Sequence, residues 1–422
     1  MPMRRKCTEA LLQWKKNPHR RPLVLSGGRQ TGKTWLLRDF GEKHYESTLY
    51  INLETDQPVS EFLSVPREAE EVLLFLETYG NKPIWQSTTL LILDNMHRLP
   101  TGPQLLEKIG LDFPGYHIVV SERIGNPRNS RYASGDVDSL FLFPMDLEEF
   151  LWANKEFSLA KEIREHFLSR EPIKKTLHER AMAQLRLYLA IGGMPGAICE
   201  YRQEKKLLLV PDIQKQILSL FLADITEFAP EGAARHSRNC FYSVPSQLCR
   251  ENSRFQYRHV VKGGTARLYE PPLQWLTHRG LLYRSSRHKA GETAEDTANR
   301  FYFPDTGLFT CQLGVPAFLL LSGEPTPQTH AILEAYLAQT FVQNGYNLSY
   351  WTSGNQAYIP FLLQKEGETL AVDFRLDSHT RNRNLARYEA CGETGKRILF
   401  STENFHTKDR YEIMPLYAAF CL

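Results

Sequence analysis

Short apolar runs alternate with longer segments of helical spacing over the first 155 residues. Such runs are typical of buried strands, because the strands of a parallel sheet are covered on both faces and are rich in Leu, Ile and Val. Strands that alternate with helices predict a parallel, doubly wound α/β sheet with its ligand at the carboxyl ends of the strands. The five predicted strands lie at residues 23–25, 48–54, 88–94, 116–121 and 139–144.

The pattern changes in the rest of the chain. Residues 154–230 carry apolar positions three and four apart and predict helices, which Gly192-Gly193-Met194-Pro195 interrupts. Residues 243–284 predict two helices, at 245–249 and 266–279, and then a strand, as in a winged helix. An amphipathic helix at 330–341 and later strands predict a second α/β domain. We expect four domains, at 1–155, 156–232, 233–310 and 311–422.

The stretch between the first predicted strand and its helix carries the strongest functional signal. Residues 27–34 have the Gly-x-x-x-x-Gly-Lys-Thr spacing of a P-loop, in the strand–loop–helix context that a P-loop requires. Its backbone N–H groups surround phosphate oxygens, Lys33 reaches the β- and γ-phosphates, and the Thr34 hydroxyl ligates Mg²⁺. We predict a site for ATP or ADP with Mg²⁺, formed by Gly27, Gly28, Arg29, Gln30, Thr31, Gly32, Lys33, Thr34 and Trp35.

The apolar run at 88–94 ends in Asp94 and is typical of a Walker B strand, whose carboxylate lies opposite the P-loop threonine. We therefore predict a metal site at Thr34 and Asp94. Many ATPases place a water-activating glutamate at the next position, where this chain has Asn95, and an amide cannot accept a proton. A polar residue that senses the γ-phosphate is expected at the end of the strand 116–121.

Composition narrows the class of protein. The chain has 422 residues and a net charge of +3, which permits nucleic-acid contact without arguing for it. Its seven scattered cysteines favour a reducing compartment, and we find no signal peptide and no run of 18 apolar residues. We expect a cytoplasmic protein without a membrane partner. The segment at 4–16 predicts a short helix whose basic face is solvated.

These motifs together resemble the bacterial and archaeal family of AAA-type P-loop ATPases that carry a C-terminal domain of unknown function. The resemblance runs nearly end to end, through RPLVLSGGRQTGKTWLL, YINLE, GYHIVV, LFPMDLEEFL, YLAIGGMPGAI, VPSQL, LQWLTHRGLLYRSSR and PLYAAFCL. It implies a P-loop NTPase domain, a helical lid, a winged helix and a restriction-endonuclease-like α/β domain, in that order. In related signalling ATPases a Gly-x-Pro contacts the adenine, which implies nucleotide contacts at Gly193 and Pro195; a simple helix break is the alternative.

Three departures from the family pattern bear on hydrolysis. The usual Asp-Glu is Asp94-Asn95 here, a Pro-Arg is Pro100-Thr101, and a small Gly-Ser is Glu122-Arg123. None of them alters the phosphate cradle. Glu54, which we place at the end of the strand beside the P-loop strand, is the alternative source of a catalytic base.

The resemblance also implies a nuclease-like site in the C-terminal domain, built in the family from a helix glutamate, a strand aspartate and a Glu-x-Lys. Position by position, Glu334 matches the helix glutamate and Pro360 replaces the aspartate. Asp373 and Arg375 stand at the two ends of the Glu-x-Lys. Proline cannot ligate a cation and arginine keeps its proton near neutral pH, so we expect a structural relic without cleavage activity.

A basic cluster near the predicted winged helix suggests a face that contacts DNA, although Glu251, Glu270 and Pro271-Pro272 dilute its charge. Alternatively, this domain only packs against the lid. The basic residues are Arg254, Arg258, His259, Lys262 and Arg267.

Taken together, the residues and the resemblance predict an ATP-binding AAA-type protein that acts as a nucleotide-dependent switch, with slow hydrolysis and a protein partner that the sequence does not identify. The alternatives are an ATP-gated, metal-dependent nuclease and a DNA-binding regulator with a structural nucleotide.

Overall fold

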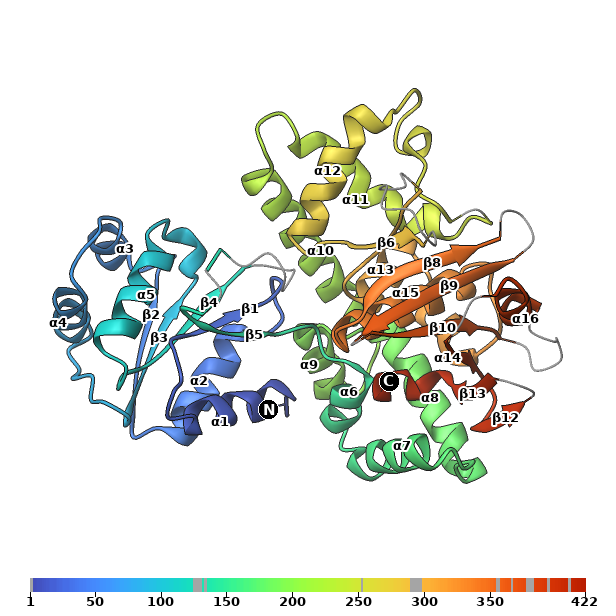
Figure 1. Cartoon of the computed structure of the whole chain (residues 1–422), viewed down its shortest axis with the longest axis horizontal. Coiled ribbons are helices and arrows are strands. Elements are labelled where there is room, and N and C mark those ends of the chain that lie inside the picture. Colours follow the sequence, from blue (N-terminus) through green and yellow to red (C-terminus); the bar gives the residue numbers. More distant parts are fainter. Residues whose placement is uncertain are drawn as a thin grey trace. The chain divides into compact units, whose positions relative to one another are not determined.

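The computed structural model of the chain describes residues 3–123, 131–132, 135–251, 253–288, 298–353, 357–365, 367–376, 383–392, 395–408 and 411–422. These residues form two compact units (Figure 1). The N-terminal unit consists of Arg4–Phe143 with His278–Gly280, and the C-terminal unit of Pro144–Thr277 with Leu281–Leu422. Within the described ranges, no helix is both long enough and apolar enough to cross a bilayer.

A five-stranded parallel sheet lies at the centre of the N-terminal unit, so the prediction of a parallel α/β domain is confirmed. Its strands run in the order β2-β3-β4-β1-β5. The central strands β3 and β4 are buried along their whole length, which explains their largely apolar sequences. The strands are β1 (Leu23–Ser26), β2 (Ser47–Asn52), β3 (Thr89–Asp94), β4 (His117–Glu122) and β5 (Asp138–Phe141).

Helices cover both faces of this sheet, because alternate residues of each strand point to opposite faces. In β3, Leu90 and Ile92 join the core under α1 and α2, whereas Leu91 and Leu93 join the core under α3, α4 and α5. Full burial of one such side chain stabilises a fold by about 1.5–3 kcal/mol. The helices are α1 (Cys7–Lys16), α2 (Lys33–His44), α3 (Gln57–Leu63), α4 (Ala69–Gly80), η1 (Met96–Arg98) and α5 (Gly102–Asp112).

The position of β2 corrects one expectation. We placed the strand before Glu54 beside the P-loop strand β1, but β2 pairs with β3, and β4 lies between β3 and β1. Burial explains this order, because β4 is buried at every position, whereas most residues of β2 are partly exposed, as suits the edge of the sheet. Glu54 therefore lies beyond the strand that neighbours the Walker B strand.

The C-terminal unit is built around a mixed sheet of eight strands, in the order β12-β13-β11-β10-β9-β8-β6-β7. The strands β6 and β8 pair in parallel, so one continuous sheet runs across residue 310, where we expected a domain boundary. The four-domain division stays a prediction. The strands are β6 (Tyr283–Arg287), β7 (Arg300–Tyr302), β8 (Asn347–Thr352), β9 (Tyr358–Lys365), β10 (Glu368–Phe374), β11 (Lys396–Ser401), β12 (His406–Lys408) and β13 (Tyr411–Pro415).

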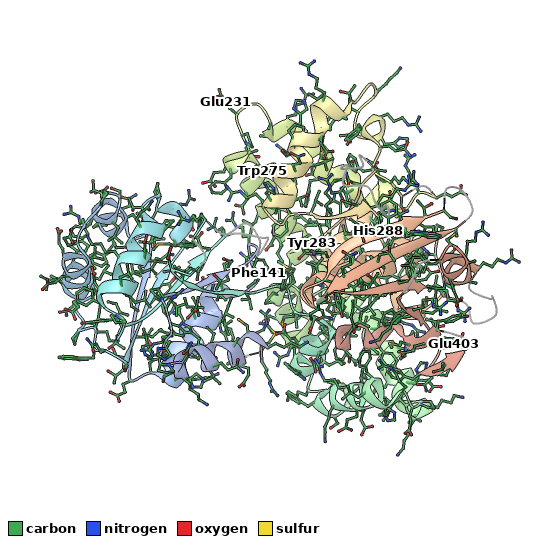
Figure 2. All side chains as sticks on the ribbon, in the orientation of Figure 1. Phe141, Glu231, Trp275, Tyr283, His288 and Glu403 are labelled. Atoms are coloured by element: carbon green, nitrogen blue, oxygen red, sulfur yellow. The ribbon has the colours of Figure 1, made fainter. Side chains whose placement is uncertain are left out.

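Helices make up most of the remaining described residues of this unit. The expected helix at 245–249 is instead the last part of the longer helix α11, which contains Pro245. Tyr283 at the start of β6 belongs to the core of the unit, and the partly buried Trp275 on α12 packs against it (Figure 2). The helices are α6 (Leu147–Ala153), α7 (Phe157–Ser169), α8 (Lys175–Ile191), α9 (Pro195–Glu204), α10 (Val210–Phe228), α11 (Ala234–Leu248), η2 (Tyr257–His259), α12 (Ala266–His278), α13 (Thr306–Leu313), α14 (Ala317–Ser322), α15 (Thr329–Gln343), α16 (Arg383–Ala390) and η3 (Leu416–Cys421).

The helix α15 differs from its predicted character. We expected an amphipathic helix at 330–341, but all residues from Ala331 to Phe341 are buried. Its polar residues have partners inside the core: Gln339 accepts hydrogen bonds from the Thr306 backbone N–H and hydroxyl, at 2.8 and 2.7 Å. In the sequence, buried polar residues that are hydrogen-bonded in this way cannot be distinguished from the solvent-facing polar stripe of an amphipathic helix.

Gly193 fixes the segment that leads from β5 into α6. The Met145 N–H donates to the Gly193 carbonyl at 2.7 Å, and the Gly193 N–H donates to Asp305 Oδ2 at 2.6 Å. A side-chain Cβ at position 193 would overlap the Met145 carbonyl oxygen. Burial raises the pKa of Asp305 to about 6, against the opposing effect of its backbone hydrogen bonds from Leu308, Gly193 and Gly307. Gly193 is thus required by close packing of two backbone segments.

Gly193→Ala should therefore destabilise the C-terminal unit by roughly 1–3 kcal/mol or more, because the added methyl group overpacks a rigid backbone contact. Gly196→Ala is the matched control, since its Cβ would meet the Ile213 side chain at an ordinary 3.6 Å. In a helix this control should be neutral or stabilising by up to about 1 kcal/mol. Urea unfolding measures both, and equal stability of the two variants would contradict the packing argument.

Candidate nucleotide-binding site

The loop between β1 and α2 has the backbone geometry of a phosphate cradle. Gly32, directly before α2, and Gln30 have left-handed φ angles of 92° and 65°. A Cβ at Gly27 would overlap the Leu142 carbonyl oxygen, so this position requires glycine. The Lys33 ammonium donates to the carbonyls of Gly27 and Gly28, at 2.9 and 2.8 Å. The Lys33 ammonium and the backbone of the loop therefore surround the same space.

Arg5, which precedes α1, supports this loop. Its guanidinium donates to the Thr31 carbonyl at 2.8 Å and to the Phe143 carbonyl at 2.7 Å. Arg5 is 6% exposed, so the expectation of a solvated basic face at 4–16 is wrong for this residue. Sequence reasoning missed it because both acceptors are backbone carbonyls of distant segments, which leave no trace in the pattern of residue types.

Asp94, at the end of β3, accepts hydrogen bonds from several side chains of the site. Its carboxylate is 2% exposed and accepts hydrogen bonds from the Thr34 hydroxyl at 2.6 Å, the Tyr50 hydroxyl at 2.8 Å and the Ser121 hydroxyl. Burial and the Asp94 charge raise the pKa of Tyr50, which keeps its hydroxyl protonated as a donor. The structure thus brings together Thr34 and Asp94, the two predicted metal ligands, whose oxygen donors suit Mg²⁺.

Asn95 lies in the left-handed region, with φ 62°, which Asn tolerates better than most residues. Its N–H donates to Ser121 Oγ at 2.9 Å, and its side-chain amide donates to Asn52 Oδ1 at 2.8 Å. The Asn52 contact comes from the neighbouring strand β2 and holds the amide in one orientation. The position of the usual glutamate is therefore filled by a fixed group without a basic site.

Glu54, the alternative base, is held by two arginines. Arg98 Nη2 lies 2.9 Å from Oε1, and Arg123 Nη2 lies 2.8 Å from Oε2. Burial alone would raise the pKa of Glu54, but the Arg98 hydrogen bond and the charges of Arg123 and Arg98 outweigh it and lower the pKa. Arg123 Nη2 also lies 3.4 Å from Asn95 Oδ1. Glu54 is thus linked to Asn95 through Arg123, and its proton affinity is reduced.

The two other departures from the family pattern have structural explanations. The Glu122 carboxylate is buried and accepts hydrogen bonds from Arg131 at 2.7 Å and from the Tyr132 hydroxyl at 2.6 Å. The Thr101 hydroxyl donates to the Leu63 carbonyl at 2.6 Å. Next to this region, burial and the charges of Arg123 and Arg98 lower the pKa of His97 to about 3, so this ring is neutral near pH 7.

Gly193 and Pro195, the predicted adenine contacts, belong to the C-terminal unit. The N–H and the carbonyl of Gly193 are both engaged within that unit, by Asp305 and Met145. Of the remaining predicted residues, Trp35 is 44% exposed in the first turn of α2.

The residues of the nuclease-like site do not assemble into a metal site. Glu334 is buried and accepts hydrogen bonds from Arg300 at 2.9 Å and from the Tyr302 hydroxyl at 2.7 Å. Asp373 instead accepts from the side chain of Asn384 at 3.1 Å. Arg375 is paired with Glu403 at 2.9 Å. Among the described residues, no group of three or more His, Cys, Asp or Glu side chains could hold a metal ion.

Comparisons with known proteins agree with this geometry in the N-terminal unit. Residues 19–151 match a family described as an AAA domain, and residues 182–318 match a domain of unknown function (DUF8612). No curated protein matches the chain. The fold, the P-loop and the family match together show that the chain carries an AAA-type P-loop ATPase domain. The matches identify neither a winged helix nor a nuclease fold in the C-terminal unit.

Several solved structures have a similar arrangement of elements but little sequence in common. A Walker-type ATPase of Pyrococcus abyssi is 12% identical, with 74% of this chain and 96% of that chain covered and a TM-score of 0.43. AMPPCP-bound DnaA from Aquifex aeolicus is 14% identical, with 64% and 86% covered and a TM-score of 0.30. Drosophila ORC bound to DNA is 16% identical, with 67% and 87% covered and a TM-score of 0.29. Similarities at this level carry no functional argument.

We predict that the protein does not cleave DNA or RNA with Mg²⁺ or Mn²⁺, because Glu334 is neutralised by Arg300 and the other ligands are replaced or paired. Incubation of labelled duplex DNA and RNA with each metal, followed by gel electrophoresis, measures this. Cleavage that Asp373→Ala removes would contradict the prediction, whereas cleavage that persists in that variant would indicate a contaminating nuclease.

Proposed function

We propose that the protein binds Mg²⁺–ATP through its AAA-type domain and acts as a nucleotide-dependent switch that hydrolyses ATP slowly. One observation carries this proposal: Lys33 lies against the loop carbonyls and Thr34 against Asp94, as binding of phosphate and metal would require, whereas neither candidate base is suited to take a proton. Asn95 is an amide held by Asn52, and Glu54 is paired with Arg98 and Arg123.

Binding follows from the groups on the loop. The Lys33 ammonium, which now donates to two loop carbonyls, is positioned to exchange them for phosphate oxygens. Thr34 and Asp94 would hold Mg²⁺, which neutralises charge on the phosphates. The partial positive charge at the N-terminus of α2 adds to this attraction. Contacts to the adenine at Gly193 and Pro195 stay a prediction. The Gly193 N–H is already bonded to Asp305, so only its carbonyl, which accepts one hydrogen bond from Met145, has a lone pair left for a further contact.

The chemical step lacks a general base. The Asn95 amide can orient a water molecule but cannot accept its proton, and positioned proton transfer typically supplies about 10²–10⁴-fold in rate. Phosphoryl transfer relies more on positioning and charge stabilisation than on the base, so some turnover remains. Arg123, which lies 3.4 Å from Asn95 Oδ1 and is paired with Glu54, would supply positive charge on the side of the site where Asn95 lies.

A route from the nucleotide to the C-terminal unit runs along the backbone after β5. At one end, the Leu142 N–H donates to the Ser26 carbonyl at 2.8 Å, directly before the P-loop. At the other end, Met145 is bonded to Gly193. A shift of the P-loop would thus be passed to Leu142, and Met145, three residues later, is fixed to the C-terminal unit. A switch requires such a connection between the two units.

DNA binding is the second candidate function, because α11, α12 and the antiparallel pair β6–β7 follow one another in the order of a winged helix. Arg258, Lys262 and Arg267 are exposed there. The Glu270 carboxylate accepts a hydrogen bond from Tyr257 and is paired with Arg284, so its charge is not available to neutralise these three residues. Gel shifts with random duplex DNA at two salt concentrations distinguish this candidate, since phosphate-driven binding weakens steeply with salt.

Lys33→Ala should abolish nucleotide binding and leave the fold intact, because it removes the phosphate-facing charge without affecting a hydrophobic core. Lys43→Ala is the control: this lysine lies on the same helix but is exposed and paired with Asp39. Titration with a fluorescent ATP analogue, with circular dichroism for folding, measures both. Equal affinity in the two variants would refute the P-loop assignment.

Wild-type turnover should be slow, on the order of minutes or longer per cycle, after the loss of a base. Asn95→Glu should speed phosphate release at least roughly tenfold without much effect on binding, because it restores a proton acceptor. Single-turnover release of phosphate measures this rate. If Glu54 is the base, the wild-type enzyme will be fast and Glu54→Gln will inactivate it; a fast enzyme that is insensitive to Glu54→Gln contradicts both mechanisms.

A further inference from the structure

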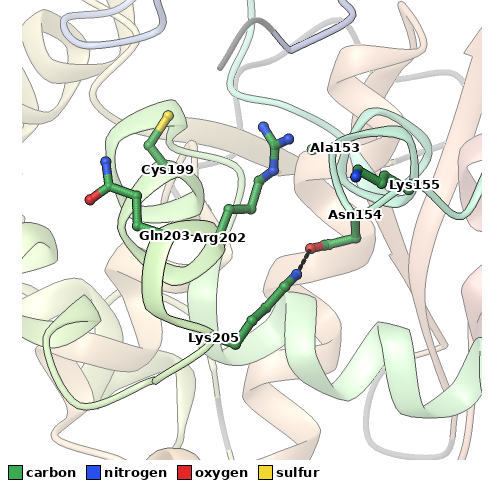
Figure 3. A pocket seen from close by; sticks show the side chains of 7 residues that line it. All are labelled: Ala153, Asn154, Lys155, Cys199, Arg202, Gln203 and Lys205. Atoms are coloured by element: carbon green, nitrogen blue, oxygen red, sulfur yellow. Dashed lines mark hydrogen bonds between the residues drawn. The ribbon is translucent and has the colours of Figure 1, made fainter.

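A pocket of about 400 Å³ lies in the C-terminal unit, between the turn after α6 and the second half of α9 (Figure 3). Arg202 and Lys205 reach from α9 toward the turn that carries Asn154 and Lys155, and Cys199 and Gln203 also line the pocket. Its volume falls within the range of about 300–1,000 Å³ that is usual for small-ligand sites. Neither the P-loop nor the nuclease-like site includes any of these residues.

The charged side chains that the structure describes around this pocket are all positive. Lys155, Arg202 and Lys205 line it, and none of its described lining residues is acidic. Lys205 donates to Asn154 Oδ1 at 3.4 Å. Among the side chains that the structure describes, no carboxylate is paired with Lys155, Arg202 or Lys205. The adjacent carboxylate of Glu156 is engaged by Arg180, at 2.6 Å. Within the described part of the chain, three cations thus line one cavity without a carboxylate among them.

The backbone shows that two of these cations occupy unusual positions. Lys155 and Lys205 have left-handed φ angles of 66° and 55°, in turns that follow α6 and α9. Glycine or asparagine is the usual residue there, since other side chains are strained in this conformation. A cation near a helix C-terminus interacts favourably with the helix dipole, which explains the lysines that follow α6 and α9. The dipole does not explain Arg202, which lies inside α9, and it does not explain why all three cations line the same cavity.

We propose that this pocket binds a small phosphorylated ligand that carries at least two negative charges. The Arg202 guanidinium can donate two parallel hydrogen bonds to a phosphate, and the two ammonium groups add point charges around it. The amides of Asn154 and Gln203 offer donors and acceptors for the rest of the ligand. A nucleic-acid backbone is the less suitable partner, because it requires cations spread along a stripe and these converge on one cavity.

Equilibrium dialysis with inorganic pyrophosphate tests this site in the full-length chain. Lys33→Ala is the background variant, so that the P-loop does not contribute binding. We expect one pyrophosphate to bind to each chain in this background. Adding Arg202→Gln should weaken the affinity at least roughly tenfold, and Lys155→Gln together with Lys205→Gln should have a similar effect. The binding should also weaken as the salt concentration rises.

A matched control separates the pocket from general surface charge. Lys161→Gln together with Lys175→Gln removes the same charge from exposed lysines of α7 and α8 and should leave pyrophosphate affinity unchanged. The proposal is overturned if Arg202→Gln binds pyrophosphate as well as its background, or if both lysine pairs have equal effects. The pocket would instead be assigned to nucleic acid if short duplex DNA displaces pyrophosphate and if Arg202→Gln removes the binding of that DNA. Each result is independent of ATP turnover.

Discussion

The buried carboxylate of Asp94 is the group on which the N-terminal unit depends. A carboxylate away from water is strongly unfavourable unless hydrogen bonds compensate its charge. Its donors come from three different segments: Thr34 from α2, Tyr50 from β2 and Ser121 from β4. Asp94 therefore links the start of α2 to β2 and β4, and the loss of any one donor would leave this buried charge less well compensated.

Both units hold a carboxylate by means of arginine side chains. Glu54 is paired with Arg98 and Arg123, and Glu334 is paired with Arg300. A guanidinium beside a carboxylate competes with any cation for the same oxygens, and at Glu54 the arginines also lower the pKa. In both units these acidic groups fasten neighbouring segments together.

Local spacing allowed part of the site to be predicted. The P-loop is a contiguous motif, and the meeting of Thr34 with Asp94 follows because the carboxyl ends of parallel strands converge at one edge of the sheet. Arg5 could not be predicted, since it binds the backbone carbonyls of Thr31 and Phe143, and any residue provides such an acceptor. The same holds for the place of β2, the buried polar residues of α15 and the arginines on Glu54, which depend on packing between segments that are distant in the sequence.

The parallel pairing of β6 with β8 also affects how the C-terminal unit folds. The two strands are separated by the residues from 288 to 346, which include β7 and the buried helix α15. During synthesis, β6 must wait for this whole segment before its partner exists, and contacts between distant residues are slow to form. Until then the edge of β6 offers unpaired backbone groups to other chains. Completion of this part of the sheet therefore waits until β8 has been synthesised.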